Sequence, residues 1–324
     1  MKPKLILLVV LLACVAALLA FPALAGRFYL QLVSKIMIMA VFAMSLNLLV
    51  GCTGLVSFGH AVFFGLGAYT LMLLSPQYGA ASLWLSLPAA IIVAAVAASA
   101  IGLLVLRSSG VYFIMATLAF TQMFFYFVTG SKALGGSDGA YIYVKPDAAI
   151  FGITPFRLAD PVQFYYVVLV LMAGTYLALR MLLRSPFGHA IQGIRVNERR
   201  MRSLGFPTFR YKLISFVIAG ALAGLAGYFD AAQFGVVNPD LFGWRLSGLV
   251  LMMVILGGMG TLYGPILGAF ALVMVQELLT DLTKHWLLPM GLFIILAVLL
   301  LPQGIAGLRG QIGAARRLMA ARRG

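Results

Sequence analysis

The reactive side chains that stand closest together are Ser57 and His60, in the run SFGH at 57–60. A serine hydroxyl beside an imidazole could form a nucleophile activated by a general base. Such a pair needs an orienting third group and an oxyanion arrangement, and neither accompanies it. A polar pair used for helix packing or for lining a pathway is therefore the favoured interpretation. His189 and His285 show no metal-ligand spacing with His60 or with carboxylates, so we expect no metal site.

Other polar, uncharged side chains stand inside long apolar runs. Thr117 and Thr121 are four residues apart and would share one face of a helix. Inside a membrane such groups either form hydrogen bonds between helices or line a route for a neutral or zwitterionic solute. Both interpretations stay open. The candidate pathway residues are Asn47, Ser57, Tyr112, Thr117, Thr121 and Gln122.

Composition identifies the elements that must position these groups. Of 324 residues, 63% are hydrophobic and 10% are charged, whereas a soluble domain carries roughly 25% charged residues. Soluble and disordered classes are therefore excluded, and both cysteines lie in apolar runs, which excludes a disulfide scaffold. We predict an all-α polytopic membrane protein with about ten transmembrane helices, some interrupted, since a span needs about 20 apolar residues. The apolar segments are approximately 5–25, 28–50, 54–74, 83–106, 110–130, 162–183, 211–234, 244–258, 261–280 and 286–308. The eighth is short, so a count of nine or eight spans stays open.

Charge distribution predicts the orientation. With both termini in the cytoplasm, 16 of the 23 Lys and Arg residues fall on the cytoplasmic side, 11 of them in the loop 184–210 and the tail 309–324. This topology accounts for the net charge of +15, and nucleic acid is not needed as a partner. The loop 131–161 falls outside. We expect one transmembrane domain over 1–324 with its first helix retained, although a cleaved signal peptide is the alternative.

The predicted spans argue against both an ion-coupled carrier and a channel for ions, because we expect no charged residue near the middle of a span. Asp230 and similar residues near helix ends are expected to extend toward the interface. Spaced glycines predict close helix contacts at 220–224 and 260–268. Gly257, Gly258 and Pro265 predict an interruption between the eighth and ninth spans, of the kind tolerated inside protein or beside a cavity.

The loop 184–210 carries its own start and stop signals for two short helices. Ser185 and Asn197 are suited to cap them, and Gly205 followed by Pro207 is suited to end the second. Four apolar side chains have spacing suited to packing against the bundle: Ile191, Ile194, Met201 and Leu204. A basic loop touching anionic lipid is the simpler alternative. A docking element for a cytoplasmic partner accounts better for the capping residues.

Taken in order, these motifs resemble the permease subunits of branched-chain amino acid ABC importers, of the LivM type. The resemblance covers residues from about 30 to 305. The matching stretches are 45–61 (SLNLLVGCTGLVSFGHA), 65–69 (GLGAY), 110–120 (GVYFIMATLAF), 188–205 (GHAIQGIRVNERRMRSLG) and 257–265 (GGMGTLYGP).

The resemblance implies a second homologous permease, two ATP-binding cassette subunits and a periplasmic or extracellular solute-binding protein, assembled in the lipid bilayer of a bacterial inner membrane. It also implies that this chain is no enzyme and binds no cofactor, since ATP and Mg would be held by the ATPases. In agreement, the sequence has no G-x-x-x-x-G-K-[ST] phosphate loop. The residues that the resemblance assigns to ATPase coupling are Gly188, Arg195, Asn197, Glu198 and Gly205.

Other functions stay open. Within the family, the solute could be urea, a short amide, another amino acid or, more distantly, a sugar. Outside it, the chain could be a stand-alone facilitator for a neutral solute, or a scaffold that recruits cytoplasmic proteins.

Overall fold

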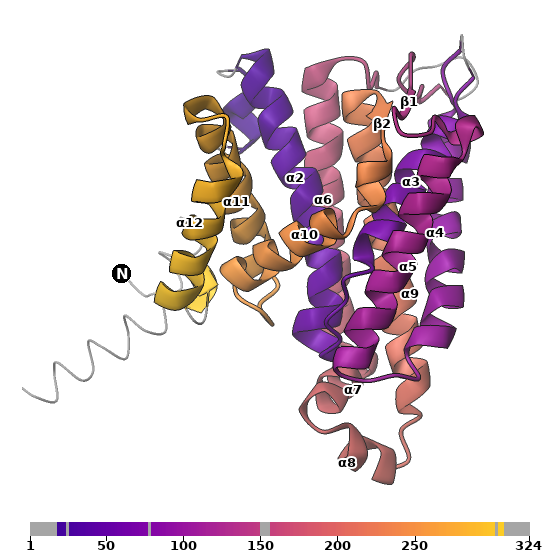
Figure 1. The fold of residues 1–324 in the computed structure, drawn as a ribbon, viewed down its shortest axis with the longest axis vertical. Coiled ribbons are helices and arrows are strands. Elements are labelled where there is room, and N and C mark those ends of the chain that lie inside the picture. The colour runs from indigo at the N-terminus through magenta and orange to yellow at the C-terminus, as the bar shows by residue number, and fades with distance from the viewer. Residues whose placement is uncertain (1–17, 24–25, 77–78, 150–155, 302–303, 308–324) are drawn as a thin grey trace, which may run out of the picture.

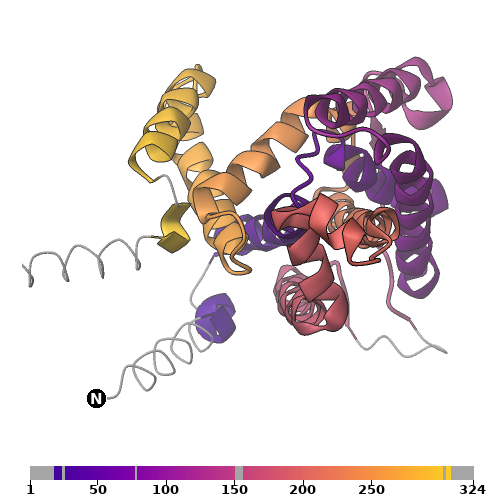
Figure 2. The same ribbon diagram turned by 90° about the horizontal axis from the view of Figure 1, so that it is seen from below.

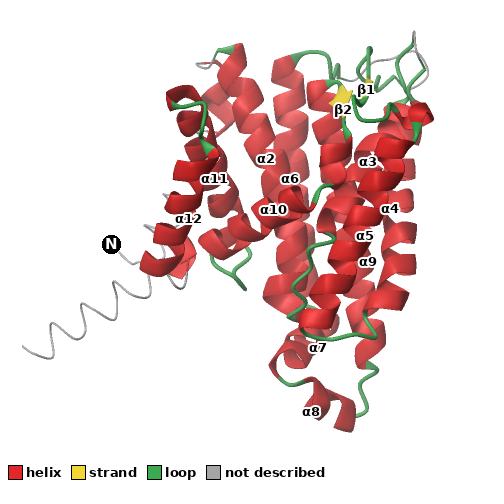
Figure 3. Cartoon of the chain, in the orientation of Figure 1, coloured by secondary structure: helices red, strands yellow, loops and turns green. Residues whose placement is uncertain are grey.

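The computed structural model describes residues 18–23, 26–76, 79–149, 156–301 and 304–307. The described part is a bundle of helices with one two-stranded ribbon at one end (Figures 1 and 3). Its helical elements are α2 (Arg27–Asn47), the π-helical turn η1 (Leu48–Thr53), α3 (His60–Leu74), α4 (Leu83–Val105), α5 (Val111–Gly130), η2 (Lys132–Leu134), α6 (Pro161–Arg184), α7 (Pro186–Val196), α8 (Glu198–Ser203), α9 (Thr208–Phe234), η3 (Pro239–Phe242), α10 (Trp244–Gly257), α11 (Gly264–Leu282) and α12 (Leu287–Leu300), and its strands are β1 (Ala140–Tyr141) and β2 (Val236–Val237).

Seven helices of the described residues are long and apolar enough to cross a membrane: α2 with η1, α4, α5, α6, α9, α11 and the segment that begins with α12. Two shorter apolar helices, α3 and α10, accompany them. The segment 5–25 lies largely outside the described residues, so the total of about ten spans and the side of each terminus stay predictions. The helical, multi-pass architecture agrees with the sequence analysis.

The long helices α2 and α9 form the centre of the bundle. The apolar window of α2 with η1 is buried throughout. α9 packs against α3 and α4, and α2 packs against α6, α9 and α11. A close approach joins α3 to α9, where a Cβ on Gly67 would collide with the Gly224 carbonyl and one on Gly227 with the Phe64 carbonyl. The predicted close contact at 220–224 is confirmed, and glycine is required there because backbone meets backbone.

Two halves of the chain repeat one architecture in opposite directions. α2 with η1 and α9 are each 27 residues long, and the residues that follow, Gly54 and Gly235, have φ angles of 80° and 68°. Each is followed by a segment without α-helix, then by a short apolar helix of 15 (α3) or 14 residues (α10), and then by two more helices. Gln233 near the end of α9 donates a hydrogen bond of 2.6 Å to the Gln31 carbonyl near the start of α2, so these helices run antiparallel. This is the arrangement of an inverted repeat with broken helices.

The two ends of the bundle differ. α7 and α8 project from one end, at the bottom of Figure 1, and lie over the bundle when it is viewed from below in Figure 2. At the opposite end, β1 from the loop 131–161 pairs antiparallel with β2, and the Trp84 indole donates to the Ala148 carbonyl over 3.1 Å. Lys145 lies 5.3 Å from the centroid of the Phe164 ring. The long loop is thus attached to the bundle by several contacts.

Candidate functional site

α7 begins where the sequence predicts. Ser185 accepts a hydrogen bond from the Gly188 N–H over 3.3 Å, and Pro186 occupies the first helical position. Gly188 is buried, and a Cβ there would collide with the Leu182 carbonyl. Gly188 therefore allows the start of α7 to pack tightly against the end of α6, which a larger residue would prevent.

α8 also has its predicted boundaries. The Asn197 side chain accepts from the Arg200 N–H over 3.0 Å and caps the helix. Gly205 adopts a φ of +86°, and α9 begins at Thr208 directly after Pro207. The two-helix connection is confirmed, because each of its capping residues acts locally.

Glu198 joins α8 to the start of α9. Its carboxylate accepts from Lys212 Nζ (2.5 Å), the Thr208 hydroxyl (3.2 Å) and the exposed Arg202 (3.1 Å). Partial burial raises the pKa of Glu198, but the hydrogen bond and charge of Lys212, with smaller contributions from Thr208 and Arg202, outweigh it, and the pKa lies below its ordinary value. Glu198 is therefore ionised at neutral pH, and its contacts are internal.

The outward side of this connection is apolar and basic. Val196 and Leu204 are 86% and 66% exposed, and Arg199 and Arg200 are exposed beside them. We call these four residues the α7–α8 outer face. Of the residues expected to pack, Ile191 and Ile194 are buried and Met201 is half-buried, but the expectation for Leu204 is wrong, because α8 ends before Leu204 can turn inward.

The first interrupted span lies at 54–59, where the sequence analysis expected a continuous helix. Two of its backbone groups, both on Phe58, bond to side chains of α5: the Phe58 N–H donates to Thr117 Oγ1 (3.2 Å), and Thr121 Oγ1 donates to the Phe58 carbonyl (3.0 Å). Within the segment, the Gly59 N–H donates to Ser57 Oγ (3.2 Å). Three candidate pathway residues thus meet here and hold non-helical backbone inside the bundle.

The predicted second interruption is confirmed at 258–263, and Asn47 holds it. Asn47 Nδ2 donates to the Thr261 carbonyl (3.0 Å), and its Oδ1 accepts from the Gly260 N–H (3.3 Å). Asn47 is fully buried at the end of α2. One amide therefore fixes the loop of one repeat against the long helix of the other.

Tyr112 and Gln122 lie apart from these two sets of contacts. Tyr112 is 80% exposed at the start of α5, and Gln122 is half-buried farther along the same helix. A pathway role for these two residues stays a prediction.

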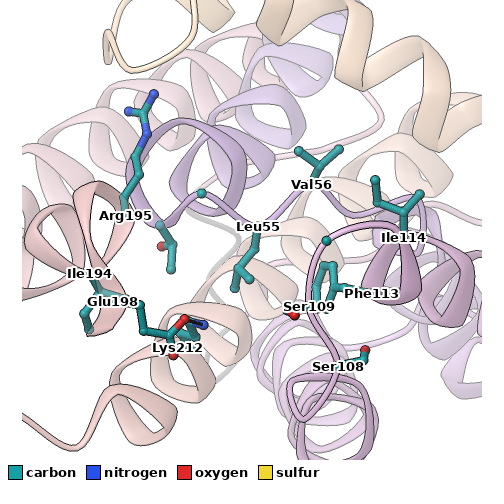
Figure 4. A pocket seen from close by; sticks show the side chains of 13 residues that line it. Leu55, Val56, Ser108, Ser109, Phe113, Ile114, Ile194, Arg195, Glu198 and Lys212 are labelled. Carbon is teal, nitrogen blue, oxygen red and sulfur yellow. Dashed lines mark hydrogen bonds and ion pairs between the residues drawn. The ribbon is translucent and has the colours of Figure 1, made fainter. Parts of the chain in front are cut away.

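A cavity of about 280 Å³ separates the first interruption from the α7–α8 connection. It is lined by the chain around Leu55 and Val56, by the turn at Ser108 and Ser109, and by the α7–α8 connection (Figure 4). The Arg195 guanidinium points away from Glu198 and Lys212 in this view. The cavity gives the backbone at 54–56 space to move.

The Ser57–His60 pair is used for packing in this structure. The His60 ring is fully buried, its Nε2 lies 2.8 Å from Ser45 Oγ, and it stacks on Phe42 at a centroid distance of 5.4 Å. Ser57 bonds to backbone instead of to His60. Across the described ranges, no three His, Cys, Asp or Glu side chains come together to hold a metal ion.

The sequence analysis misjudged Asp230. It is 6% exposed in α9, and its Oδ1 has no hydrogen-bond partner among the described residues. The expected extension to the interface is wrong because Asp230 is buried where this end of α9 meets the start of α2, as the bond from Gln233 to the Gln31 carbonyl shows. A buried carboxylate in a span is a functional candidate. The sequence analysis did not include Asp230 among the candidates because it stands only four residues before the end of α9.

Comparison with known proteins agrees with this geometry. Residues 28–302 match the family described as branched-chain amino acid transport system, permease component. The chain is 34% identical to the high-affinity branched-chain amino acid transport system permease protein LivM of Escherichia coli (strain K12), over 94% of this chain and 75% of the relative. It is 24% identical to the probable branched-chain amino acid transport permease protein LivH of Methanocaldococcus jannaschii, over 75% of this chain and 77% of the relative. The autoinducer 2 import system permease protein LsrC of Photorhabdus laumondii is 30% identical over 51% of this chain and 50% of its own length. No solved structure matches.

Proposed function

Because this chain belongs to the branched-chain amino acid transport permease family, we propose that it carries a branched-chain amino acid such as leucine, isoleucine or valine across a bacterial inner membrane, as one subunit of an ATP-driven importer. Family membership makes the chain a multi-pass membrane permease of an ABC transport system. Two of its sequence relatives are named for branched-chain amino acid transport.

The main support for an ATPase partner is the composition of the α7–α8 outer face. It presents two exposed apolar side chains, Val196 and Leu204, flanked by Arg199 and Arg200. An apolar anchor with an arginine rim is typical of a protein interface. We assign this face to an ATP-binding cassette subunit in the cytoplasm, and ATP and Mg to that subunit.

The opposite end is assigned to the solute-binding protein. The loop 131–161 is attached there through the β1–β2 ribbon, and it exposes Tyr141 and Tyr143, which are 64% and 77% exposed. Exposed tyrosines suit a docking surface because they offer large contact area at small entropic cost. The solute then passes between this chain and a second, homologous permease, whose movements follow ATP binding and hydrolysis in two ATPase subunits.

Co-purification of the tagged chain in mild detergent tests the assembly. We expect two P-loop ATPases and a second permease to be recovered with it. Val196→Asp combined with Leu204→Asp should remove the ATPases, because it places two carboxylates in an apolar contact. Tyr141→Asp combined with Tyr143→Asp is the matched control and should retain them. Recovery of a stable homo-oligomer alone would overturn the proposal in favour of a facilitator.

The substrate needs its own test, because one relative of this scaffold is named for autoinducer 2 import. With the complex in liposomes, excess unlabelled leucine, isoleucine or valine should abolish uptake of labelled leucine. Urea, a short amide or an aromatic amino acid should leave it unchanged. Competition by one of these and none by isoleucine would reassign the substrate within the family.

A further inference from the structure

One side chain of the α7–α8 connection reaches both interrupted spans. Arg195 Nη1 donates a hydrogen bond to the Gly51 carbonyl in η1. A Cβ placed on Gly260, in the second interruption, would lie 3.2 Å from the same nitrogen. A Cβ on Gly54, at the start of the first, would lie 3.1 Å from Arg195 Cγ. The stem of Arg195 therefore crosses one interruption, and its guanidinium lies at the other.

The two interruptions also touch each other at this point. A Cβ on Gly51 would lie 2.7 Å from the Gly260 nitrogen and would collide with the Asn47 amide. Since Asn47 bonds to both Gly260 and Thr261, the end of η1 and the loop 258–263 form one contact set. We call Asn47, Gly51, Gly54 and Gly260 the inner junction. A displacement of either interrupted segment must rearrange this junction.

Arg195 differs in this respect from the other polar side chains of α7. His189 bonds to the Ser185 carbonyl (2.9 Å) and Gln192 to the Leu183 carbonyl (3.5 Å), both within the α6–α7 connection. Arg195 bonds instead to a residue 144 positions away in sequence. The Gly51 carbonyl lies near the end of a helical segment, where water or a nearby side chain can also satisfy a carbonyl. Its hydrogen-bonding need alone therefore does not explain why a residue of α7 bonds to it.

The surroundings permit the junction to move. The cavity of about 280 Å³ borders Thr53, Gly54, Leu55 and Val56 on one side and Arg195 on the other. Glu198, with Lys212 and Thr208, attaches the adjoining helix α8 to the start of α9, which runs through the bundle. The α7–α8 connection therefore contacts the bundle in two places: through Glu198 at the start of α9, and through Arg195 at the inner junction. A movement of α7 and α8 would reach the bundle through both contacts.

We propose that Arg195 is a positioning residue that transmits displacement of α7 to the inner junction, so that both interrupted spans rearrange together when the cytoplasmic ATPase moves the α7–α8 connection. The proposal rests on the proposed function, since it requires an ATPase on the α7–α8 outer face. Arg195 is exposed as a residue, but its guanidinium bonds to the Gly51 carbonyl, so we leave docking to Val196 and Leu204.

The test compares variants of the assembled complex in liposomes, measuring ATPase content, ATP hydrolysis and leucine uptake. Arg195→Ala should assemble and hydrolyse ATP as the wild type does, while leucine transported per ATP falls about tenfold or more, the effect of losing one charged hydrogen bond. Arg195→Lys should restore part of the ratio, because one ammonium can reach Gly51 without also covering Gly260. Arg180→Ala, an exposed arginine of α6, is the control and should keep the wild-type ratio.

An unchanged ratio of transport to hydrolysis in Arg195→Ala would overturn the proposal. Hydrogen exchange of the wild-type complex gives a second test that does not depend on a variant folding. ATP should change exchange at 49–55 and 258–263 together with that of α7, and a change at α7 alone would also overturn it. A wild-type chain that assembles with no ATPase would instead overturn the proposed function, and this inference with it.

Discussion

Replacing Glu198 by Gln removes the charge that joins α8 to α9. Lys212 is 12% exposed at its side chain and Glu198 is 32% exposed, so the pair is intermediate between surface and buried pairs. Exposed pairs contribute about 0–1 kcal/mol, and hydrogen bonds to charged groups about 1.5–3 kcal/mol. With the partial exposure discounted, we expect a loss of about 1–2 kcal/mol in the local stability of residues 198–212.

Hydrogen exchange of the purified chain measures this loss directly. A change of about 1–2 kcal/mol corresponds to a 5- to 30-fold change in an equilibrium, so amide protection in α8 and the first turn of α9 should fall by that factor. Arg202→Ala is the matched control: its side chain is 70% exposed in an i,i+4 pair, and protection should fall by less than about threefold. Equal effects of the two substitutions would refute the argument that burial of Lys212 makes this pair strong.

The pH dependence provides a second measurement on the same group. Since the pKa of Glu198 is lowered in the folded state, the folded protein releases this proton more readily than the unfolded one. The stabilisation is therefore complete above the ordinary glutamate pKa of about 4.3 and is lost as the pH falls through the lower folded value. Protection of α8 should decrease on acidification in the wild type and should change less in Glu198→Gln.

Two further substitutions test the packing of the interrupted spans. Gly67→Ala places a methyl group against the Gly224 carbonyl, and we expect a loss of about 1–3 kcal/mol or more from overpacking, seen as a lower melting temperature in detergent. Gly174→Ala, on α6 with open space around it, is the control and should be neutral or slightly stabilising. Asn47→Ala removes both hydrogen bonds to the loop 258–263, and hydrogen exchange in that loop should rise about tenfold or more; unchanged exchange would show that other contacts hold it.

The local features of this chain could be predicted from its sequence. Ser185, Asn197 and Gly205 act through backbone within three residues of themselves, and the two helices of 184–210 appear where these residues place them. The break after Gly257 follows from a glycine pair that weakens helix propensity. Such signals need no knowledge of the rest of the fold.

The distant contacts could not be predicted in this way. The segment 54–59 reads as part of an apolar span, and its break is stabilised by Thr117 and Thr121 of another helix. Arg195 and Glu198 stand in a loop that suggests docking, yet their partners lie in η1 and at the start of α9. The sequence singled out Asn47, Thr117 and Thr121 as polar residues within apolar spans, but not the distant backbone groups to which they bond.

The central claim is that transport by this chain is driven by ATP through the α7–α8 connection. The most direct measurement is leucine uptake into liposomes that contain the chain with its ATPases, second permease and binding protein. The account predicts uptake only with ATP and binding protein present, and its loss when Val196 and Leu204 are both changed to Asp. Leucine flux through the chain alone, without ATP and unaffected by those substitutions, would contradict it.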